Sequence, residues 1–146
     1  MQREIITFQV AGQLFGLDIM AIREIRAWSP VTRLPAVPDY VSGVVNLRGT
    51  VLPVLDLAAR LGWEPTEATP RNPIIVTDID GQTRGLIVHS VNDIVSLPAD
   101  SLQRPEGTTH DDIVQFIEGL APMDEDMVIV LNLASLAGDH QMDLAA

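Results

Sequence analysis

Internal repetition limits the folds open to this chain more than any other feature of its sequence. One set of matches has a constant offset of 69 residues and joins Gly16-Leu17, Ile22 and Glu24-Ile25 to Gly85-Leu86, Val91 and Asp93-Ile94. A second set has an offset of 76 residues and joins Val54-Leu55-Asp56-Leu57-Ala58 to Val130-Leu131-Asn132-Leu133-Ala134. An insertion of seven residues in the loop 98–112 accounts for the difference. The repetition indicates two copies of one supersecondary unit.

The composition indicates that each copy is built from strands. Hydrophobic residues make up 47% of the chain and aromatic residues only 4%, so valine, isoleucine and leucine must form the core. Branched aliphatic side chains favour strands. The apolar pattern predicts strands at 4–10, 13–18, 22–28, 44–47, 50–55, 74–78, 83–89, 91–97, 113–120 and 127–131, with short helical segments near 19–22, 39–42, 57–61 and 133–136.

We therefore expect an all-β fold made of two small barrels of about five strands each. Each copy alone is close to the lower size limit of a stable domain, so the two should share apolar surface within a single domain over 1–146. The proline-rich stretch 64–73 lacks large apolar groups and is the best candidate for a linker. It sets approximate subdomains at 1–68 and 69–146, with exchange of terminal strands left open, and a groove is expected where the barrels diverge.

The net charge of −11 argues against nucleic acid and against an anionic membrane surface as partners, because both attract positively charged proteins. The charge is uneven: residues 1–68 carry six arginines and seven acids, whereas residues 69–146 carry three arginines and thirteen acids. The first residues form too short an apolar run for a signal peptide, and no stretch approaches the roughly 18 apolar residues of a membrane span. We expect a cytoplasmic protein without direct membrane insertion.

No catalytic, cofactor or metal site is evident in the sequence. Cysteine and lysine are absent, which excludes disulfides, thiolate zinc sites, cysteine nucleophiles and Schiff-base chemistry. The histidines at 89, 110 and 140 have no spacing that would place two of them on one metal ion. The clusters at 110–112 and 124–126 lack the ligand spacing of a calcium loop, so hydrated turns explain them more simply than weak ion sites.

Polar side chains stand out in the aliphatic hairpin around Arg48-Gly49. These two residues form its turn, where glycine tolerates a positive φ angle. Alternation places Asn46 and Arg48 on one face, so an amide and a guanidinium lie together beside the turn. Pro53 has no N–H for a ladder and predicts an edge strand or a bulge. Asp56 is expected to be the N-cap of the short helix that follows.

Glu24 and Arg48 both lie in aliphatic strand segments of the less acidic half. One reading is a surface ion pair worth about 0–1 kcal/mol. The other is that Glu24 holds the guanidinium of Arg48 beside an apolar groove, where a partner helix accepts its hydrogen bonds. The residues alone favour neither reading.

Several runs of residues form a specific pattern. They are IREIR at 22–26, VTRLP at 31–35, GVVNLRGTVLPVLDL at 43–57, GLIV at 85–88, VNDI at 91–94 and LNL at 131–133. This pattern closely resembles the CheW family of chemotaxis coupling proteins over nearly the whole chain. The resemblance implies a single CheW-like domain of two five-stranded SH3-like β-barrel subdomains packed together, with a few short helices.

The resemblance also implies a non-enzymatic adaptor without cofactor or metal. Such an adaptor joins the cytoplasmic tip of a chemoreceptor (a methyl-accepting chemotaxis protein) to the regulatory domain of the histidine kinase CheA, at receptor arrays beneath the inner membrane. Receptor helices are expected to enter the groove between the barrels. The receptor-binding candidates are Ile22, Glu24, Gly43, Asn46, Arg48 and Val51. The kinase-binding candidates are Leu17, Leu47, Thr50 and Leu52, whose residue types core packing explains equally well.

Two alternatives stay open. A CheW-like coupling protein of a pilus, biofilm or other alternative chemosensory pathway would carry the same pattern, and only its receptor partner or neighbouring genes would distinguish it. A small-molecule-binding or hydrolytic β-barrel would instead need a closed pocket with converging polar groups.

Overall fold

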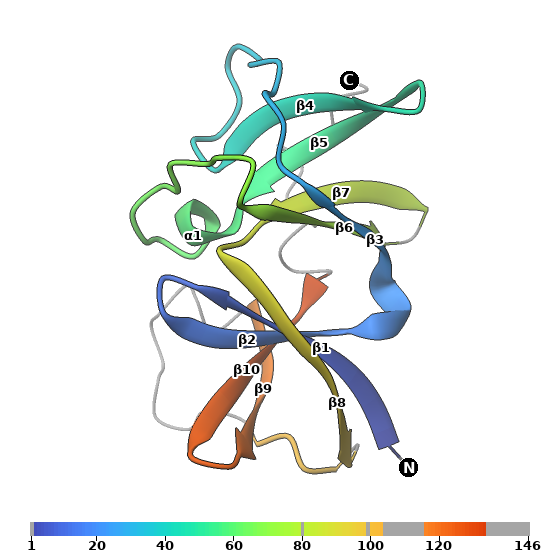
Figure 1. The fold of residues 1–146 in the computed structure, drawn as a ribbon, viewed down its shortest axis with the longest axis vertical. Helices are drawn as coiled ribbons and strands as arrows, with labels where there is room; N and C mark the ends of the chain where they lie inside the picture. Colours follow the sequence, from blue (N-terminus) through green and yellow to red (C-terminus); the bar gives the residue numbers. More distant parts are fainter. Residues whose placement is uncertain (1, 80, 99, 104–115, 134–146) are drawn as a thin grey trace.

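The computed structural model describes residues 2–79, 81–98, 100–103 and 116–133, whose strands form two five-stranded sheets (Figure 1). Sheet A has the order β8-β1-β2-β10-β9, with β1 (Gln2–Val10), β2 (Gln13–Asp18), β8 (Ser90–Pro98), β9 (Ile117–Met123) and β10 (Asp126–Leu131). Sheet B has the order β3-β6-β7-β5-β4, with β3 (Ile22–Ala27), β4 (Val41–Leu47), β5 (Thr50–Asp56), β6 (Pro73–Ile79) and β7 (Gln82–Ile87). The described helices are η1 (Ile19–Ala21) and α1 (Leu57–Arg60). The predicted all-β class with two five-stranded units is confirmed.

The two sheets repeat each other strand by strand, as the sequence offsets predict. β1, β2 and β3 correspond to β6, β7 and β8, while β4 and β5 correspond to β9 and β10, so the two strand orders are the same. The parallel contact falls at equivalent places, with Val54 opposite Gly85 in sheet B and Val130 opposite Gly16 in sheet A. A β-carbon at either glycine would collide with an isoleucine methyl of the neighbouring strand. The internal repetition is therefore a structural duplication.

The two copies exchange one strand. The chain passes from sheet A to sheet B through η1, and it returns at Val88-His89 before β8. As a result β3 of the first copy pairs with β6 of the second, and β8 of the second copy pairs with β1 of the first. The boundary expected near residue 68 therefore lies inside sheet B, between β5 and β6.

The proline-rich stretch 64–73 is a tethered loop within sheet B and does not link the two sheets. The backbone N–H and the hydroxyl of Thr66 both donate to the buried carboxylate of Asp56, over 2.6 and 2.8 Å. The side-chain amide of Asn72 donates to the carbonyl of Val88 at 3.0 Å. These bonds compensate for the missing apolar anchors, and the stretch joins the last strand of the first copy to the first strand of the second.

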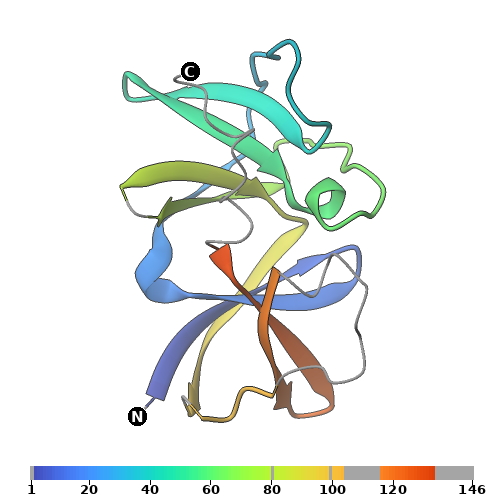
Figure 2. The same ribbon diagram turned by 180° about the vertical axis from the view of Figure 1, so that it is seen from behind.

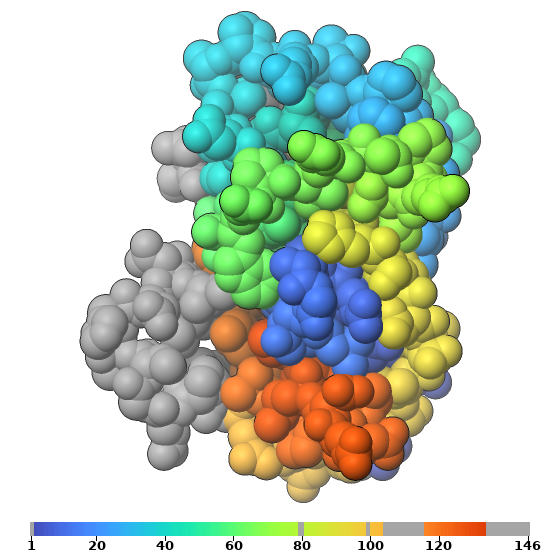
Figure 3. Space-filling view, turned by 60° about the vertical axis from the view of Figure 1, so that its left-hand side comes forward, coloured from blue at the N-terminus to red at the C-terminus, as the bar shows by residue number. Residues whose placement is uncertain are grey.

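Apolar side chains fill three clusters. One lies inside sheet B and one inside sheet A. The third joins the sheets and is here called the seam; its members include Ile6, Phe8, Phe15 and Leu17 of sheet A and Val41, Leu55, Ile75 and Leu86 of sheet B. In the space-filling view the green segment that includes α1 lies directly against the blue strands of the other sheet (Figure 3). The expected sharing of apolar surface is therefore present.

Polar and aromatic contacts also cross the seam. The Nδ1 atom of His89 accepts a hydrogen bond from the N–H of Ala11 at 2.8 Å, while its Nε2 atom lies 3.3 Å from the hydroxyl of Thr66. The guanidinium of Arg60 lies over two rings, 4.3 Å from the centre of Tyr40 and 4.4 Å from that of Phe116. Cation–π contacts of this kind contribute about 0.5–2 kcal/mol. The sheets are thus fixed to one another by more than apolar burial.

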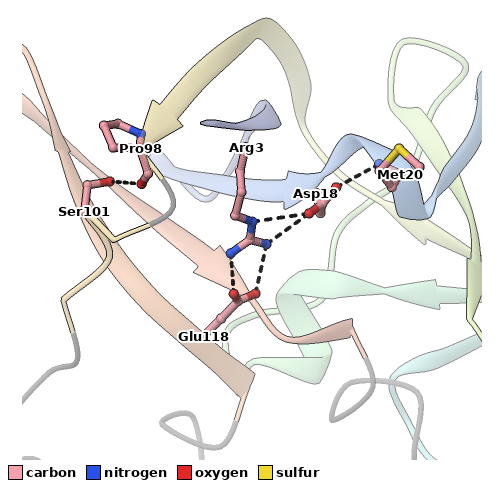
Figure 4. Close-up of polar contacts among 6 residues, drawn as sticks. All are labelled: Arg3, Asp18, Met20, Pro98, Ser101 and Glu118. Carbon is pink, nitrogen blue, oxygen red and sulfur yellow. Dashed lines mark hydrogen bonds and ion pairs between the residues drawn. The ribbon is translucent and has the colours of Figure 1, made fainter. Parts of the chain in front are cut away.

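Sheet A is curled, and one arginine joins strands that are not neighbours (Figure 4). The guanidinium of Arg3 on β1 bonds the carboxylate of Asp18 on β2 at 3.1 Å and that of Glu118 on β9. In the strand order β2 and β10 separate β1 from β9, so the sheet must bend to bring these groups together. The hydrogen bond to Glu118 is the main cause that raises the pKa of the Arg3 side chain above its usual value. Seen from behind, β9 and β10 form the orange outer hairpin of this sheet (Figure 2).

Some local predictions were wrong. Pro53 lies in an interior strand, because β5 runs between β7 and β4. The proline is accommodated because β5 pairs with β7 only from Val54 onward, whereas the equivalent ladder in sheet A begins one residue earlier, at Ile129. The prediction of Asp56 as the N-cap residue of α1 is confirmed. Its side chain makes no cap bond, however, because the carboxylate accepts hydrogen bonds from Thr66.

Two element boundaries also differ from the prediction. β4 begins at Val41, where a helical turn over 39–42 was expected, because the backbone pairs with β5 from that residue. β9 (Ile117–Met123) continues three residues past the predicted end at 120, because its closing partner across the two-residue turn is Asp126. The first residues of the predicted strand, 113–115, lie outside the described residues. The expected helix at 133–136 lies almost wholly outside the described residues.

Candidate interaction surface

The tip of the β4–β5 hairpin is a tight turn held by its own side chains. Arg48 and Gly49 have φ angles of 50° and 87°, the left-handed pair that a two-residue hairpin turn requires. The Oδ1 atom of Asn46 accepts the N–H of Gly49 at 2.7 Å. The amide predicted to stand beside the turn therefore braces it, and the brace fixes where the Arg48 side chain starts.

The predicted Glu24–Arg48 ion pair is present. The Nη2 atom of Arg48 lies 3.0 Å from the Oε1 atom of Glu24, although these residues come from opposite edge regions of sheet B. The Arg48 side chain is 71% exposed and that of Glu24 is 33% exposed. At this exposure the pair contributes only about 0–1 kcal/mol to stability. Its effect is on geometry, because the carboxylate aims the remaining N–H groups of an exposed guanidinium.

Two hollows flank this tip. The inner hollow, of about 330 Å³, is lined by Arg23, Glu24, Leu47, Arg48, Thr50, Val76 and Thr83. The edge hollow, of about 320 Å³, is lined by Thr32, Val44, Val45, Asn46, Gly49, Thr50 and Val51. Val51 is 63% exposed, which is high for an aliphatic side chain in a strand. The tip thus combines one held cation, an exposed aliphatic group and two concave surfaces.

Gly43 acts through its lack of a side chain. Thr32 and Val44 exchange two backbone hydrogen bonds of 2.8 and 2.9 Å, which brings the Thr32 carbonyl against Gly43. A β-carbon at residue 43 would overlap that carbonyl oxygen, and its φ angle of 151° is unfavourable for other residues. Gly43 is buried, so it affects the edge of β4 only by letting the Thr32 segment approach closely.

The other predicted residues occupy different environments. Ile22 is partly buried and packs against the seam. Leu17 belongs to the seam, and Leu47 and Leu52 belong to the cluster inside sheet B. Among the four kinase-binding candidates Thr50 alone is exposed. Glu24, Asn46, Arg48, Thr50 and Val51 therefore form one contiguous surface, whereas the buried residues support it.

A third hollow, larger than the two beside the tip, was not predicted. It has a volume of about 620 Å³ and lies among the loops beside sheet B, lined by Trp28, Val31, Arg33, Leu34, Val37, Pro38, Asp39, Val41, Ser42, Asp56, Pro65, Thr66, Glu67, Ala68 and Ile87. The expected groove lay between the two units, but the three hollows described here are all lined by residues 23–87. The two proline-rich loops signal irregular backbone in the sequence, although not the space they leave open.

Ion-binding features are sparse in the part of the chain that the structure describes. Within these residues no group of three or more histidine and acidic side chains is arranged to hold a metal ion. Asp124 and Glu125 form the turn of the β9–β10 hairpin. The cluster at 110–112 lies outside the described residues. No described helix is long and apolar enough to cross a membrane.

Fold and surface together define an all-β protein built by duplication, with an exposed polar tip beside two hollows. The chain belongs to the CheW family, because the model of the CheW-like domain matches residues 4–141. It is 39% identical to the probable chemotaxis protein CheW of Rhizobium etli and 38% identical to the chemotaxis protein CheW of Rhizobium meliloti, in each case over 98% of this chain and 92% of the relative. The crystal structure of the scaffolding protein TtCheW from Thermoanaerobacter tengcongensis has a TM-score of 0.87 at 32% identity and covers 99% of this chain and 94% of that one.

Proposed function

We propose that this chain is a non-enzymatic adaptor that couples chemoreceptors to the histidine kinase CheA in bacterial chemotaxis. Family membership and relatives named chemotaxis protein CheW support this role. The observation that carries the molecular part is the Arg48–Glu24 pair, held at 3.0 Å on an exposed tip between two hollows. The adaptor acts in the cytoplasm, at receptor arrays beneath the inner membrane.

The receptor-facing surface in this proposal comprises Ile22, Glu24, Gly43, Asn46, Arg48 and Val51. The exposed members make the contacts: the oriented guanidinium of Arg48 donates to acceptors on a receptor helix, and Val51 adds apolar contact. The buried members act indirectly, since Ile22 positions β3 and Gly43 permits the Thr32 bridge. A helix laid into a groove needs both apolar burial and one oriented polar anchor to fix its register.

The kinase-facing surface is assigned to the region of Leu17, Leu47, Thr50 and Leu52. Of these, Thr50 is exposed and offers a hydroxyl to a partner. The three leucines are buried, so their contribution is to hold the strands that present the surface. Substituting them would disturb binding through the fold.

Reconstitution tests the proposal. Wild-type chain is mixed with a CheA kinase and a receptor signalling fragment, and kinase autophosphorylation is measured with each component left out in turn. We expect activity under receptor control to require all three. Activity that is indifferent to this chain would contradict the adaptor function.

Arg48→Ala tests the surface assignment separately. The variant should remain folded and lose most receptor pull-down, because the ion pair contributes little to stability. Arg71→Ala removes another exposed arginine, in the loop before β6, and should bind as the wild type does. The double variant Glu24→Arg/Arg48→Glu should still form an ion pair. It should not bind the receptor fragment, because the exposed side chain at residue 48 is then negatively charged. Unchanged pull-down by folded Arg48→Ala would remove Arg48 from the surface while leaving the adaptor role intact.

Two other functions are distinguished by their partners. A coupling protein of a pilus, biofilm or other alternative pathway would respond to a different receptor fragment in the same assay. A small-molecule-binding barrel is favoured by one observation, the hollow of about 620 Å³ beside sheet B. A rise in melting temperature with a member of a metabolite panel would support it.

A further inference from the structure

The outer edge of β4 has room and hydrogen-bonding groups for one more strand. Val44 already uses its outward N–H and C=O to pair with Thr32. Outward and inward groups alternate along a strand in an antiparallel ladder, so the N–H and C=O of Asn46 point to the same outer side. The edge hollow lies along this segment. Asn46 therefore presents a backbone donor and acceptor beside open space.

The chain's own segment does not extend this pairing. If the antiparallel contact of Thr32 with Val44 continued, the residue facing Asn46 would be Pro30. Proline has no N–H and cannot donate to the Asn46 carbonyl. The internal bridge thus ends after one residue pair.

The equivalent edge in sheet A is closed by the sequence itself. Leu120 of β9 corresponds to Val44 and is likewise paired on its outer side, with Gln103. Two residues further along β9 lies Pro122, which corresponds to Asn46 and faces Met127 as Asn46 faces Val51. A proline at an exposed edge removes the outward donor and protects against strand addition. Sheet A carries this protection and sheet B lacks it.

We propose that the β4 edge at Asn46 binds an extended peptide segment of a partner protein by strand addition. The segment pairs with the N–H and C=O of Asn46, fills the edge hollow and covers Val51. Charge selects the segment: no acidic side chain lines the edge hollow, and the exposed Arg48 lies two residues beyond Asn46 in a chain of net charge −11. The segment therefore carries acidic side chains near the turn. This goes beyond the proposed function, because a receptor helix has already used its backbone groups and cannot pair with an edge.

Amide exchange at single residues tests the proposal. The probe is a synthetic peptide of about eight residues that alternates valine and threonine and ends in glutamates, a pattern suited to strand addition. We expect this peptide to slow hydrogen exchange of the Asn46 amide by about tenfold or more. A peptide with N-methylated backbone amides, which cannot donate to the Asn46 carbonyl, should give no protection. No protection with millimolar unmethylated peptide, or equal protection with both peptides, would overturn the proposal.

Proline substitution supplies the matched variants. Asn46→Pro removes the outward N–H and copies the residue that sheet A accommodates at the same place, while Asn46→Ala removes only the side chain. Peptide binding, followed by shifts of the Val51 methyl signals, should be lost in the first and kept in the second. Pro122→Asn opens the other edge, where the tip Asp124-Glu125 is acidic, so a peptide of the same pattern that ends in arginines should protect the amide of residue 122. Equal loss in both Asn46 variants would assign the effect to the side chain and contradict strand addition.

A second copy of the chain is the competing occupant. Two β4 edges could pair with each other, which would appear as a dimer in sedimentation experiments that Asn46→Pro abolishes. That result would overturn the assignment to a partner peptide. A monomer over the same concentration range supports it.

Discussion

The hairpins β4–β5 and β9–β10 are copies of one another that carry opposite charges at their tips. Arg48 and Asp124 occupy equivalent positions and have nearly equal φ angles of 50° and 55°. Val51 and Met127 are also equivalent, and they are 63% and 44% exposed. The duplication has kept the backbone and the exposed apolar group while reversing the charge. Backbone geometry is therefore a property of the repeat, whereas the choice of partner depends on side chains at its tips.

The way each sheet joins distant strands differs as well. In sheet A the Arg3 guanidinium joins β1 to β2 and β9. The positions equivalent to Arg3, Asp18 and Glu118 in sheet B are Asn72, Ile87 and Ser42. Ile87 and Ser42 line the hollow of about 620 Å³. Sheet A is thus tied where sheet B is open, and sheet B uses the exposed Arg48–Glu24 pair instead.

The largest expected effect comes from replacing the two glycines that lie against the Thr32–Val44 and Gln103–Leu120 bridges. Gly43→Ala should lower the free energy of unfolding by about 3 kcal/mol, because the new methyl overlaps the Thr32 carbonyl at an unfavourable φ angle. Gly119→Ala, at the equivalent place in sheet A, should cost less, since its nearest neighbour is the Leu102 side chain. Urea unfolding of both variants measures the difference. Equal costs would show that the two edges are equally tight.

Gly43→Asp sharpens the same test. It adds a carboxylate to the collision with the Thr32 carbonyl and should impair binding of receptor and kinase together, because the whole hairpin edge is displaced. Pull-down with each partner measures this. Loss of one partner only would show that Gly43 lies at a contact and does not act through the fold.

A medium effect is expected from the two ion-pair systems. Arg3→Met should cost about 1–2 kcal/mol of unfolding free energy, since it leaves the Asp18 and Glu118 carboxylates facing one another without their cation. Arg48→Met should cost about 0–1 kcal/mol because its pair is exposed. Thermal or urea unfolding of the two variants measures these two costs. A larger cost for Arg48→Met would mean that sheet B, too, depends on its ion pair.

The smallest effect should come from copying one tip onto the other. Asp124→Arg/Glu125→Gly gives the β9–β10 hairpin the Arg-Gly turn of its counterpart. Stability should change by about 0.5 kcal/mol or less, as for most exposed substitutions. Receptor pull-down should stay at the wild-type level, because the acid equivalent to Glu24 is Asp93, whose side chain is one methylene shorter and reaches less far toward the tip. Increased receptor binding would show that an arginine at a turn is sufficient by itself.

Much of this fold could be predicted because the sequence contains the same structural unit twice. The offsets between Gly16 and Gly85 and between Val54 and Val130 recover the equivalent parallel contacts of the two sheets. The Glu24–Arg48 pair was predictable because alternation and the turn place both groups at the surface. The second copy supports the offsets, whereas the pair follows from local signals in the first copy alone.

The rest depends on contacts between segments far apart in sequence. The strand exchange could not be predicted, because the residues of β3 and β8 are compatible with either sheet. Asp56 has the sequence position of a helix cap, but Thr66 reaches it from a loop ten residues later. The hollow beside sheet B arises from the way two loops are tethered. The apolar periodicity of the sequence predicts strands and helices but not the positions of loops.

The exchanged strands also suggest how such a chain can arise. Two identical short chains that each lend their third strand to the other form a domain-swapped homodimer with this pairing pattern. The last strand of one copy, β5, and the first strand of the next, β6, belong to the same sheet, so a short peptide suffices to fuse them. Once the two copies are joined in one chain, they no longer need identical sequences in order to pair with each other. Each tip is then free to acquire its own charge, and a symmetric dimer becomes a molecule with two unlike ends.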